Sequence, residues 1–411
     1  MYYLYGDIMT KEEILKKYFG YDSFRGIQRE AIDSILNNND TIVLLATGGG
    51  KSIIYQVPAI MLDGISIIVT PLISLMVDQV KNLNKLNIKA RYLNSLMEQD
   101  EQNKVYEEIA RGVVKIIYTS PERLQNKRFI SLISNKNVSM LCLDESHSVI
   151  GRYGFRMAYD KIDEFLALLK NRPVVAALTA TARDETIKEI IKICKMENPK
   201  IFKNSFDRPN LYYGIVKVKD KIKYLKEYID NHNERGIIYT STRAICELLY
   251  KKLKELGFLC SVYHGGMEGE EKIKNQNEYV SGKTKIMVAT ISFGLGIDIP
   301  DIRYVILYNI PSSLEDLSQM IGRCSRDNKY GEGIVLWTLE DVKIGLHFIY
   351  GFKENSIDRQ TFLREKENRK EKLNSVVSFC LSRGCLRHKL LGYFGESSNK
   401  RCNNCSWCCN H

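Results

Sequence analysis

Short apolar runs alternate with amphipathic stretches along most of the chain, and they form two series. In the first series, runs rich in β-branched residues are the strand candidates, at 41–45, 66–70, 115–120, 139–143 and 174–179. In the second series the strand candidates lie at 235–241, 260–264, 285–290, 304–309 and 333–337. Apolar strands separated by helical patterns are typical of parallel sheets that are covered by helices. The pattern therefore predicts an α/β fold with two lobes in tandem.

The pattern changes toward the end of the chain. From about residue 342 it becomes helical and highly charged, which a solvated helix surface explains. We expect an N-terminal extension over residues 1–9, a first lobe over 10–205, a second lobe over 206–342 and a helical subdomain over 343–411. The lobes would join near residues 206–213. Met9 is an alternative start, which would make the first eight residues dispensable.

A glycine-rich segment between an apolar run and a helical pattern indicates a phosphate site. Glycines 48–50 let backbone N–H groups turn toward an anion, and a helix that starts near Lys51 adds its positive dipole end. Lys51 would reach the β- and γ-phosphates, and Ser52 would hold Mg²⁺. The usual first glycine of this motif is replaced by Leu45. The alternative is a simple turn, and the motif does not specify the nucleotide.

Two carboxylates follow the apolar run at 139–143. Ligands bind at the carboxyl ends of strands in an α/β sheet. Asp144 would hold Mg²⁺, and Glu145 would orient and deprotonate an attacking water. Capping of the next helix explains an isolated acidic pair about as well.

Composition limits the class of protein only moderately. The chain has 411 residues, 44% of them hydrophobic, and a net charge of +11. No window approaches the ~20 apolar residues of a membrane span, and the N-terminus does not resemble a signal peptide, so we expect an intracellular protein. The positive charge is spread along the chain and favours a nucleic-acid partner only weakly.

The cysteines gather at the C-terminal end, where six of the eleven follow residue 379. Without an export signal, metal binding is a better explanation than disulfides. A C-x₁₆-C-x₂-C-x₂-C pattern suits a tetrahedral structural zinc site, and its members are Cys385, Cys402, Cys405 and Cys408. Competing ligands are Cys380, Cys409 and His411. The other explanation is a set of free or oxidised cysteines.

The ordered series of motifs resembles the RecQ family of superfamily 2 DNA helicases over residues 10–410. In the first lobe the matching segments are FGYDSFRGIQ (19–28), TGGGKS (47–52), TPLISLMVDQV (70–80), TSPERL (119–124), DESH (144–147) and LTATA (178–182). In the second lobe they are IIYTSTR (237–243), YHGGM (263–267), ATISFGLGIDIPDIR (289–303) and QMIGRCSRD (319–327). The family also carries a zinc subdomain with a Y-F-G-E stretch, as at 393–396 here. The resemblance implies two RecA-like lobes followed by a helical zinc-binding subdomain.

The resemblance also implies roles for individual residues in ATP binding and hydrolysis. Tyr21 would lie on the adenine face with Arg25 beside it, and Gln28 would bond the base edge. The remaining implied nucleotide contacts are Thr47, Gly48, Gly49, Gly50, Lys51, Ser52 and Asp298. Besides Lys51, Asp144 and Glu145, the implied catalytic set contains His147, Gln319, Arg323 and Arg326. The two arginines would act as fingers on the γ-phosphate, which suits the charge that develops there. In isolation, two arginines three residues apart would suggest surface ion pairing.

The chain departs from the family in two places. The family's aromatic-rich loop, which senses single-stranded DNA, is one residue shorter here and lacks its tryptophan. Tyr153, Phe155 and Arg156 are the candidate DNA contacts, since aromatic and Arg side chains stack on bases. The sequence also ends three residues after Cys408, before the family's winged helix, and so looks like a minimal form.

The resemblance implies an ATP-dependent DNA helicase, 3′-to-5′, with ATP, Mg²⁺ and structural Zn²⁺ as cofactors. Single-stranded and tailed duplex DNA are the expected partners, without a membrane, and a monomer is the expected state. The alternatives are an RNA helicase and a nucleic-acid-stimulated ATPase that binds or anneals strands without unwinding.

Overall fold

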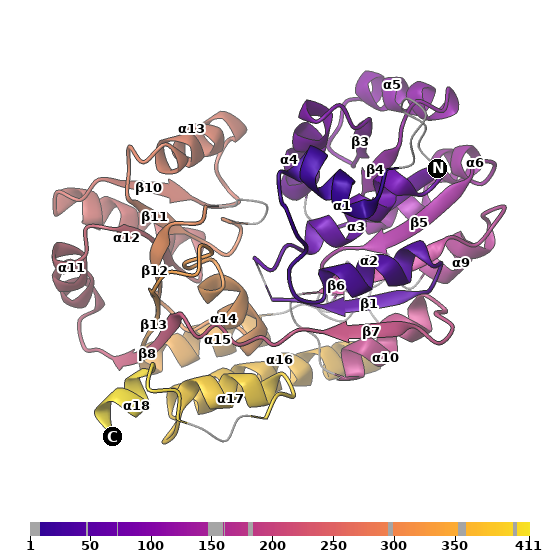
Figure 1. Ribbon diagram of the computed structural model, residues 1–411. Helices are drawn as coiled ribbons and strands as arrows, with labels where there is room; N and C mark the ends of the chain where they lie inside the picture. The colour runs from indigo at the N-terminus through magenta and orange to yellow at the C-terminus, as the bar shows by residue number, and fades with distance from the viewer. Residues whose placement is uncertain are drawn as a thin grey trace. The chain divides into compact units, whose positions relative to one another are not determined.

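The chain forms two compact units, residues 1–205 and residues 206–411, each with its own parallel sheet (Figure 1). The computed structural model describes residues 9–46, 48–71, 73–146, 159, 161–179, 184–294, 299–351, 359–397 and 401–411. The division into four parts made from the sequence stays a prediction.

The first unit is built on a seven-stranded sheet with the order β3-β4-β2-β5-β6-β1-β7. Its strands are β1 (Thr41–Leu44), β2 (Ile65–Val69), β3 (Ala90–Leu93), β4 (Ile116–Thr119), β5 (Val138–Leu143), β6 (Val174–Thr179) and β7 (Lys200–Lys203). All strand pairs are parallel. Every residue of β1, β2, β4 and β6 is buried, which explains why these strands are almost continuous Ile, Val, Leu and Ala runs.

Helices cover this sheet and bury apolar side chains against it (Figure 1). The described helices are α1 (Lys11–Ile14), α2 (Gln28–Leu36), α3 (Lys51–Met61), α4 (Ile73–Lys85), α5 (Gln99–Ala110), α6 (Lys127–Ile133), α9 (Ile162–Ala167) and α10 (Asp184–Ile193). Short helical turns lie at η1 (Leu15–Phe19) and η2 (Pro121–Gln125). Side-chain caps fix two of the starts, since Thr10 caps α1 and Asn126 caps α6.

The second unit contains a six-stranded sheet with the order β10-β11-β9-β12-β13-β8. Its strands are β8 (Leu211–Lys217), β9 (Arg235–Tyr239), β10 (Cys260–Tyr263), β11 (Ile286–Ala289), β12 (Ile302–Leu307) and β13 (Gly331–Trp337), again all parallel. Gly236 in β9 allows the ring of Tyr304 to pack on the backbone, because a Cβ there would lie 2.0 Å from the ring.

The helices of the second unit continue past the sheet into the C-terminal segment. They are α11 (Lys221–Asn231), α12 (Arg243–Glu255), α13 (Gly269–Val280), α14 (Leu314–Ile321), α15 (Leu339–Tyr350), α16 (Arg359–Cys380), α17 (Leu386–Tyr393) and α18 (Ser406–Asn410). The last helix packs on the edge strand β8, where Tyr213 pairs with Cys405 and Ile215 N–H donates to Ser406 Oγ at 3.2 Å. The C-terminal segment therefore covers a strand edge that would otherwise be open.

The structure confirms the predicted α/β fold with two parallel-sheet lobes and a helical C-terminal region. Three strands were not predicted, namely β3, β7 and β8, and all three lie at sheet edges. β7 is mostly exposed and has lysine at both ends, so it lacks the signal of a buried strand. β8 begins at Leu211, so its first residues belong to the segment 206–213 that was predicted as the joint between the lobes.

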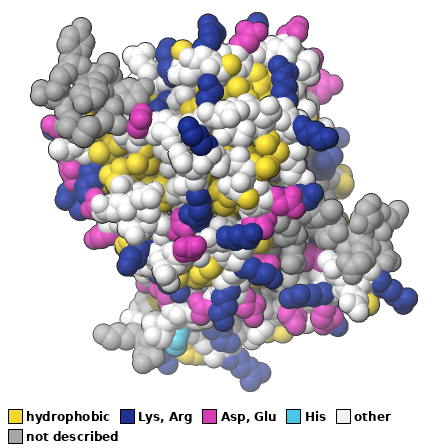
Figure 2. Space-filling view, turned by 90° about the vertical axis from the view of Figure 1, so that its right-hand side faces the viewer, with side chains coloured by type: hydrophobic (Ala, Val, Ile, Leu, Met, Phe, Trp, Pro, Cys, Tyr) yellow, Lys and Arg dark blue, Asp and Glu magenta, His cyan; other side chains and the backbone are white. Residues whose placement is uncertain are grey.

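Surface charge is mixed on the face drawn in Figure 2, where Lys and Arg lie among Asp and Glu instead of forming one continuous patch. In the part of the chain that the structure describes, no helix is both long and apolar enough to span a membrane.

Candidate nucleotide site and metal centre

The glycine-rich loop links β1 to the first turn of α3, as the sequence predicted. Gly48 and Gly50 have φ angles of 84° and 79°, which are left-handed values that favour glycine. A Cβ on Gly50 would lie 2.5 Å from the side-chain nitrogen of Gln28, so the close approach also requires glycine. Lys51 and Ser52 follow at once in the first turn of α3. The loop therefore has the form of an anion cradle.

Leu45 and Gln28 shape this loop from two sides. Leu45 is buried, and a Cβ on Gly49 would lie 2.6 Å from its Cγ, so the residue that replaces the usual glycine packs under the loop. Gln28 is also buried; its Nε2 donates to the carbonyls of Gly49 and Gly50, each at 3.1 Å. Its Oε1 accepts from the Arg25 amide at 2.9 Å. Gln28 thus ties the segment before α2 to the phosphate loop.

Tyr21 and Arg25 lie together at the surface of the first unit. The Arg25 guanidinium is 5.4 Å from the centre of the Tyr21 ring, which is 46% exposed. This leaves an aromatic face and a cation beside the segment that Gln28 anchors. The contacts of all three side chains with adenine stay a prediction.

A buried ion pair joins the loop to the acidic pair. Lys51 Nζ lies 2.8 Å from Glu145 Oε1, with the two side chains 11% and 13% exposed. Glu145 has a φ of 50°, which is rare for a non-glycine residue and costs about 1 kcal/mol. Strain of this kind is typical of functional sites, because the surroundings must hold it in place.

Asp144 follows β5 directly and is 5% exposed. Burial, and next the charge of Glu145, raise the pKa of Asp144 to about 6, whereas Lys51 and the Glu145 amide, which donates to Asp144 at 2.9 Å, act in the opposite direction. A divalent cation would favour the ionised form of this carboxyl group. The candidate ligands Asp144 and Ser52 offer only oxygen atoms, which fits Mg²⁺.

Gln319, Arg323 and Arg326 lie at the C-terminal end of α14 and in the turn that follows. Arg323 is 7% exposed, whereas Gln319 and Arg326 are half-buried. Between the arginines, Ser325 is fully buried and has a φ of 47°. The turn thus presents the candidate arginine fingers on a strained backbone, and their action on phosphate stays a prediction.

Several candidate residues lie outside the described residues. They are Thr47, His147, Tyr153, Phe155, Arg156 and Asp298.

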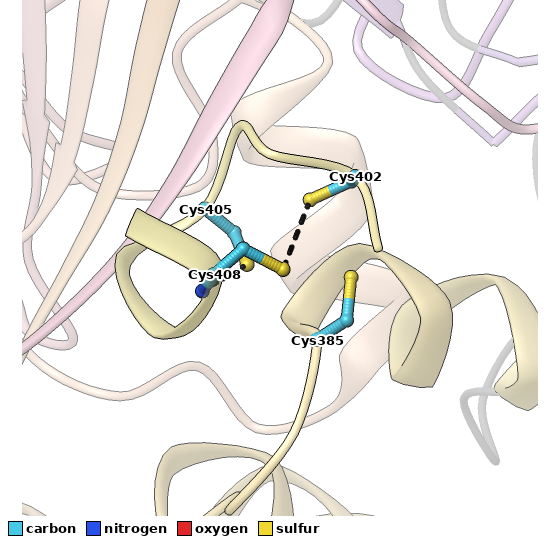
Figure 3. Close-up of side chains that lie close together, drawn as sticks. All are labelled: Cys385, Cys402, Cys405 and Cys408. Carbon is cyan, nitrogen blue, oxygen red and sulfur yellow. Dashed lines mark hydrogen bonds between the residues drawn. The ribbon is translucent and has the colours of Figure 1, made fainter. Parts of the chain in front are cut away.

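The four predicted zinc ligands form one cluster in the second unit (Figure 3). All four sulfur atoms lie within 4.8 Å of one another, and the Cys402 and Cys408 sulfurs are 3.9 Å apart. Cys385 is the N-cap residue of α17 and Cys405 that of α18, whose first turn also carries Cys408, so the two helix starts bring three of the thiols together. This sulfur-only set fits a closed tetrahedral zinc site.

Backbone amides favour a thiolate at one member of the cluster, Cys405, whereas burial raises the pKa of Cys402 and Cys408. Burial alone would raise the pKa of Cys405, but the amides of Cys408 and Leu386 and the neighbouring thiols lower it to about 7. Among the described residues, the competing candidates Cys380, Cys409 and His411 are not part of the cluster.

Sequence reasoning missed two arginines that connect the cysteine segment to the turn after α14. Arg208 bonds the carbonyls of Cys324 and Ser325, and Arg387 bonds the segment around Arg208. The available signal was the charged Asp-Arg pair before a proline in the predicted joint, at 207–209.

Three family models match consecutive parts of the chain. They describe a DEAD/DEAH box helicase domain over residues 25–190, a helicase conserved C-terminal domain over 220–328 and a RecQ zinc-binding domain over 346–409. A relative named "Probable ATP-dependent DNA helicase RecS", from Bacillus subtilis, is 33% identical, and the match covers 98% of this chain and 92% of the relative. The chain belongs to the RecQ family. It carries that family's zinc-binding domain together with the two helicase domains.

Other relatives of this RecQ-family chain are longer. The "ATP-dependent DNA helicase RecQ" of B. subtilis is 35% identical over 97% of this chain and 66% of the relative. The chain spans less than two thirds of this relative and of the next two RecQ proteins. A "Putative ATP-dependent RNA helicase R290" from Acanthamoeba polyphaga mimivirus is 36% identical over 97% of this chain and 72% of the relative.

Solved structures support the two-lobed helicase fold at low sequence identity. Helicase Lhr of Mycobacterium smegmatis bound to single-stranded DNA and AMP-PNP has a TM-score of 0.67 and 17% identity, over 91% of this chain and 58% of that one. Saccharomyces cerevisiae Dbp5 bound to RNA and ADP BeF3 has a TM-score of 0.69 and 17% identity, over 89% of this chain and 98% of that one.

Proposed function

We propose that this RecQ-family chain is an ATP-dependent DNA helicase that moves 3′-to-5′ on single-stranded DNA and unwinds tailed duplexes. The observation that carries the proposal is the buried Lys51–Glu145 ion pair next to Asp144, at the edge where a glycine loop opens α3. A cation for phosphate and a carboxylate for water lie there in direct contact. This arrangement fits phosphoryl transfer to water.

Each residue of the candidate nucleotide site has a proposed role in ATP hydrolysis. Gly48–50 and Lys51 bind the phosphates, and Ser52 and Asp144 would hold Mg²⁺, which neutralises charge on the phosphates when bound. Glu145 orients the attacking water and accepts its proton. Arg323 and Arg326 stabilise the charge that develops on the γ-phosphate. Tyr21, Arg25 and Gln28 select adenine, and Thr47, His147, Gln319 and Asp298 complete the site.

The cysteine cluster serves folding in this proposal. Cys385, Cys402, Cys405 and Cys408 would hold one zinc ion with no open position, so the ion has no role in the reaction. Tyr153, Phe155 and Arg156 would contact single-stranded DNA.

RNA is the second candidate substrate, and the relative named as a putative RNA helicase, 36% identical, favours it. A strand-displacement assay with 3′-tailed DNA, 5′-tailed DNA and RNA duplexes decides between them. We expect ATP-dependent displacement of the 3′-tailed DNA only, and none by a Glu145→Gln variant. Faster unwinding of the RNA duplex than of DNA would show that RNA is the substrate. DNA-stimulated ATPase without displacement of any duplex would contradict helicase activity.

A further inference from the structure

A side chain outside the predicted sites holds the turn that carries the two candidate arginine fingers. Arg208 lies in the segment that leads into β8, and its Nη2 donates to the carbonyl oxygens of Cys324 at 3.1 Å and Ser325 at 2.8 Å. These carbonyls belong to the two residues between Arg323 and Arg326. One guanidinium group therefore fixes two successive peptide planes in the middle of the turn.

The turn needs such support because its backbone is strained. Ser325 is fully buried with a φ of 47°. Asn210 Nδ2 donates to the Ser325 carbonyl at 3.2 Å and to the Lys329 carbonyl at 2.8 Å, and Arg303 Nη1 donates to Ser325 Oγ at 2.9 Å. A strained residue keeps its conformation only where several contacts determine it. Arg208 supplies two of these contacts.

Arg208 is in turn held by the cysteine-bearing segment. Arg387, in α17, is 6% exposed; its Nη1 donates to Asp207 Oδ1 at 2.5 Å and to the Arg208 carbonyl at 2.6 Å. Its Nη2 donates to the Leu211 carbonyl at 2.5 Å. The backbone on both sides of Arg208 is therefore anchored by one buried guanidinium.

Two further contacts extend this anchoring along the same segment. Glu396 Oε1 accepts from the Phe206 amide at 2.6 Å, and the Phe206 and Phe394 rings are 5.0 Å apart. Asn404, between two of the clustered cysteines, donates to the Pro209 carbonyl at 3.0 Å. The segment before β8 is thus clamped between the cysteine region and the arginine turn.

We propose that Arg208 is a positioning residue for ATP hydrolysis, which acts through Arg323 and Arg326 and is itself held in place by Arg387. The inference rests on the proposed function, because it assumes that these arginines stabilise the transferring phosphoryl group. A misplacement of about 1 Å in such a group can lower a rate by about 100-fold. Arg208 reaches the reaction only through the turn, so its effect falls on turnover and not on ATP affinity.

The test compares DNA-stimulated ATP hydrolysis of full-length Arg208→Ala and Arg208→Lys with wild type. We expect kcat to fall about 10- to 100-fold in Arg208→Ala, with KM for ATP and affinity for single-stranded DNA within about 3-fold. Arg208→Lys keeps a cation but not the planar fork, so its loss should be intermediate. Arg235→Ala is the matched control, since Arg235 is a half-buried arginine of the same unit that bonds Asp301 at 2.9 Å. Its kcat should stay within about 2-fold of wild type.

A double-mutant cycle separates positioning from general destabilisation. In single-turnover assays, the Arg208→Ala/Arg326→Lys double variant should hydrolyse ATP less than about 3-fold more slowly than Arg326→Lys alone, because the turn is already impaired. A full multiplicative loss in the double variant would overturn the positioning role, as would normal kcat in folded Arg208→Ala and Arg208→Lys. Either of these outcomes would contradict only the positioning role, because the wild type would still hydrolyse ATP. A wild type without ATPase activity would instead overturn the proposed function and this inference with it.

Discussion

Lys51 and Glu145 illustrate how two residues far apart in the sequence define a site only together. Each is mostly buried, where an isolated charge is costly, and their charged groups lie 2.8 Å apart. Removing one of them leaves an uncompensated charge on the other. The two residues nevertheless have different chemical tasks, so their substitutions should have different effects.

Lys51→Ala should abolish ATP hydrolysis and weaken ATP binding, because the phosphates lose their cation. Glu145→Gln should bind ATP and lose at least about 100-fold in turnover, because the amide cannot accept the proton of water. Both should keep affinity for single-stranded DNA within about 3-fold. The measurements are nucleotide binding, steady-state ATPase and DNA binding, with Lys81→Ala, an exposed lysine, as the control. Turnover near wild type in Glu145→Gln would remove Glu145 from its catalytic role.

At the scale of elements, the sequence predicted the strands that are fully buried in the sheets. The central strands β1, β2, β4 and β6 are buried at every position, so their apolar runs are visible without a structure. The missed strands β3, β7 and β8 all contain exposed or half-buried positions, unlike these fully buried runs. The motifs located the glycine loop, the acidic pair and the cysteines, since each has a fixed local spacing.

Tertiary contacts explain why the rest was not predicted. The φ of 50° at Glu145 and the bonds from Arg208 to the Cys324 and Ser325 carbonyls involve residues up to 117 positions apart, and no local pattern encodes them. Gln28 was expected to face adenine, and its bonds to Gly49 and Gly50 carbonyls were not expected.

The cysteine cluster gives the sharpest prediction for a single element. Cys405 is fully buried, caps α18 and pairs with Tyr213 of β8. Loss of its metal bond should therefore destabilise both the start of α18 and its contact with β8. Cys405→Ser should lose bound zinc and yield much less soluble protein. The neighbouring Cys409 is exposed and outside the cluster, so Cys409→Ser should keep one zinc per chain and a wild-type yield. Elemental analysis measures the bound zinc of each variant, and the amount of soluble protein measures its folding. Wild-type protein without stoichiometric metal would contradict the zinc site.

The segment after the acidic pair should couple DNA to ATP hydrolysis. A base–aromatic stack contributes ~1–3 kcal/mol, which would change the ratio of two loop states roughly 5- to 150-fold. Tyr153→Ala and Arg156→Ala should therefore keep basal ATPase and lose stimulation by single-stranded DNA. ATPase rate against DNA concentration is the measurement. If both folded variants keep wild-type stimulation, another part of the chain senses DNA.

At the scale of the whole molecule, each unit has a sheet and an apolar core of its own. The glycine loop, Lys51 and the acidic pair belong to the first unit, whereas the cysteine cluster belongs to the second. Two ligands should therefore stabilise two different parts of the same chain. This separation is a property of the fold that unfolding experiments report directly.

Thermal unfolding by calorimetry should show two transitions, one for each unit, because two cores need not unfold together. Mg-ADP at about 100 times its Kd should stabilise the first unit by about 2.7 kcal/mol and raise the temperature of one transition. A zinc chelator should lower the temperature of the other transition, since metal-binding free energy is folding free energy. Lys51→Ala is the control for the nucleotide, because it should abolish the first shift and leave the second intact. A single transition that responds equally to Mg-ADP and to the chelator would show instead that the two units unfold as one cooperative body.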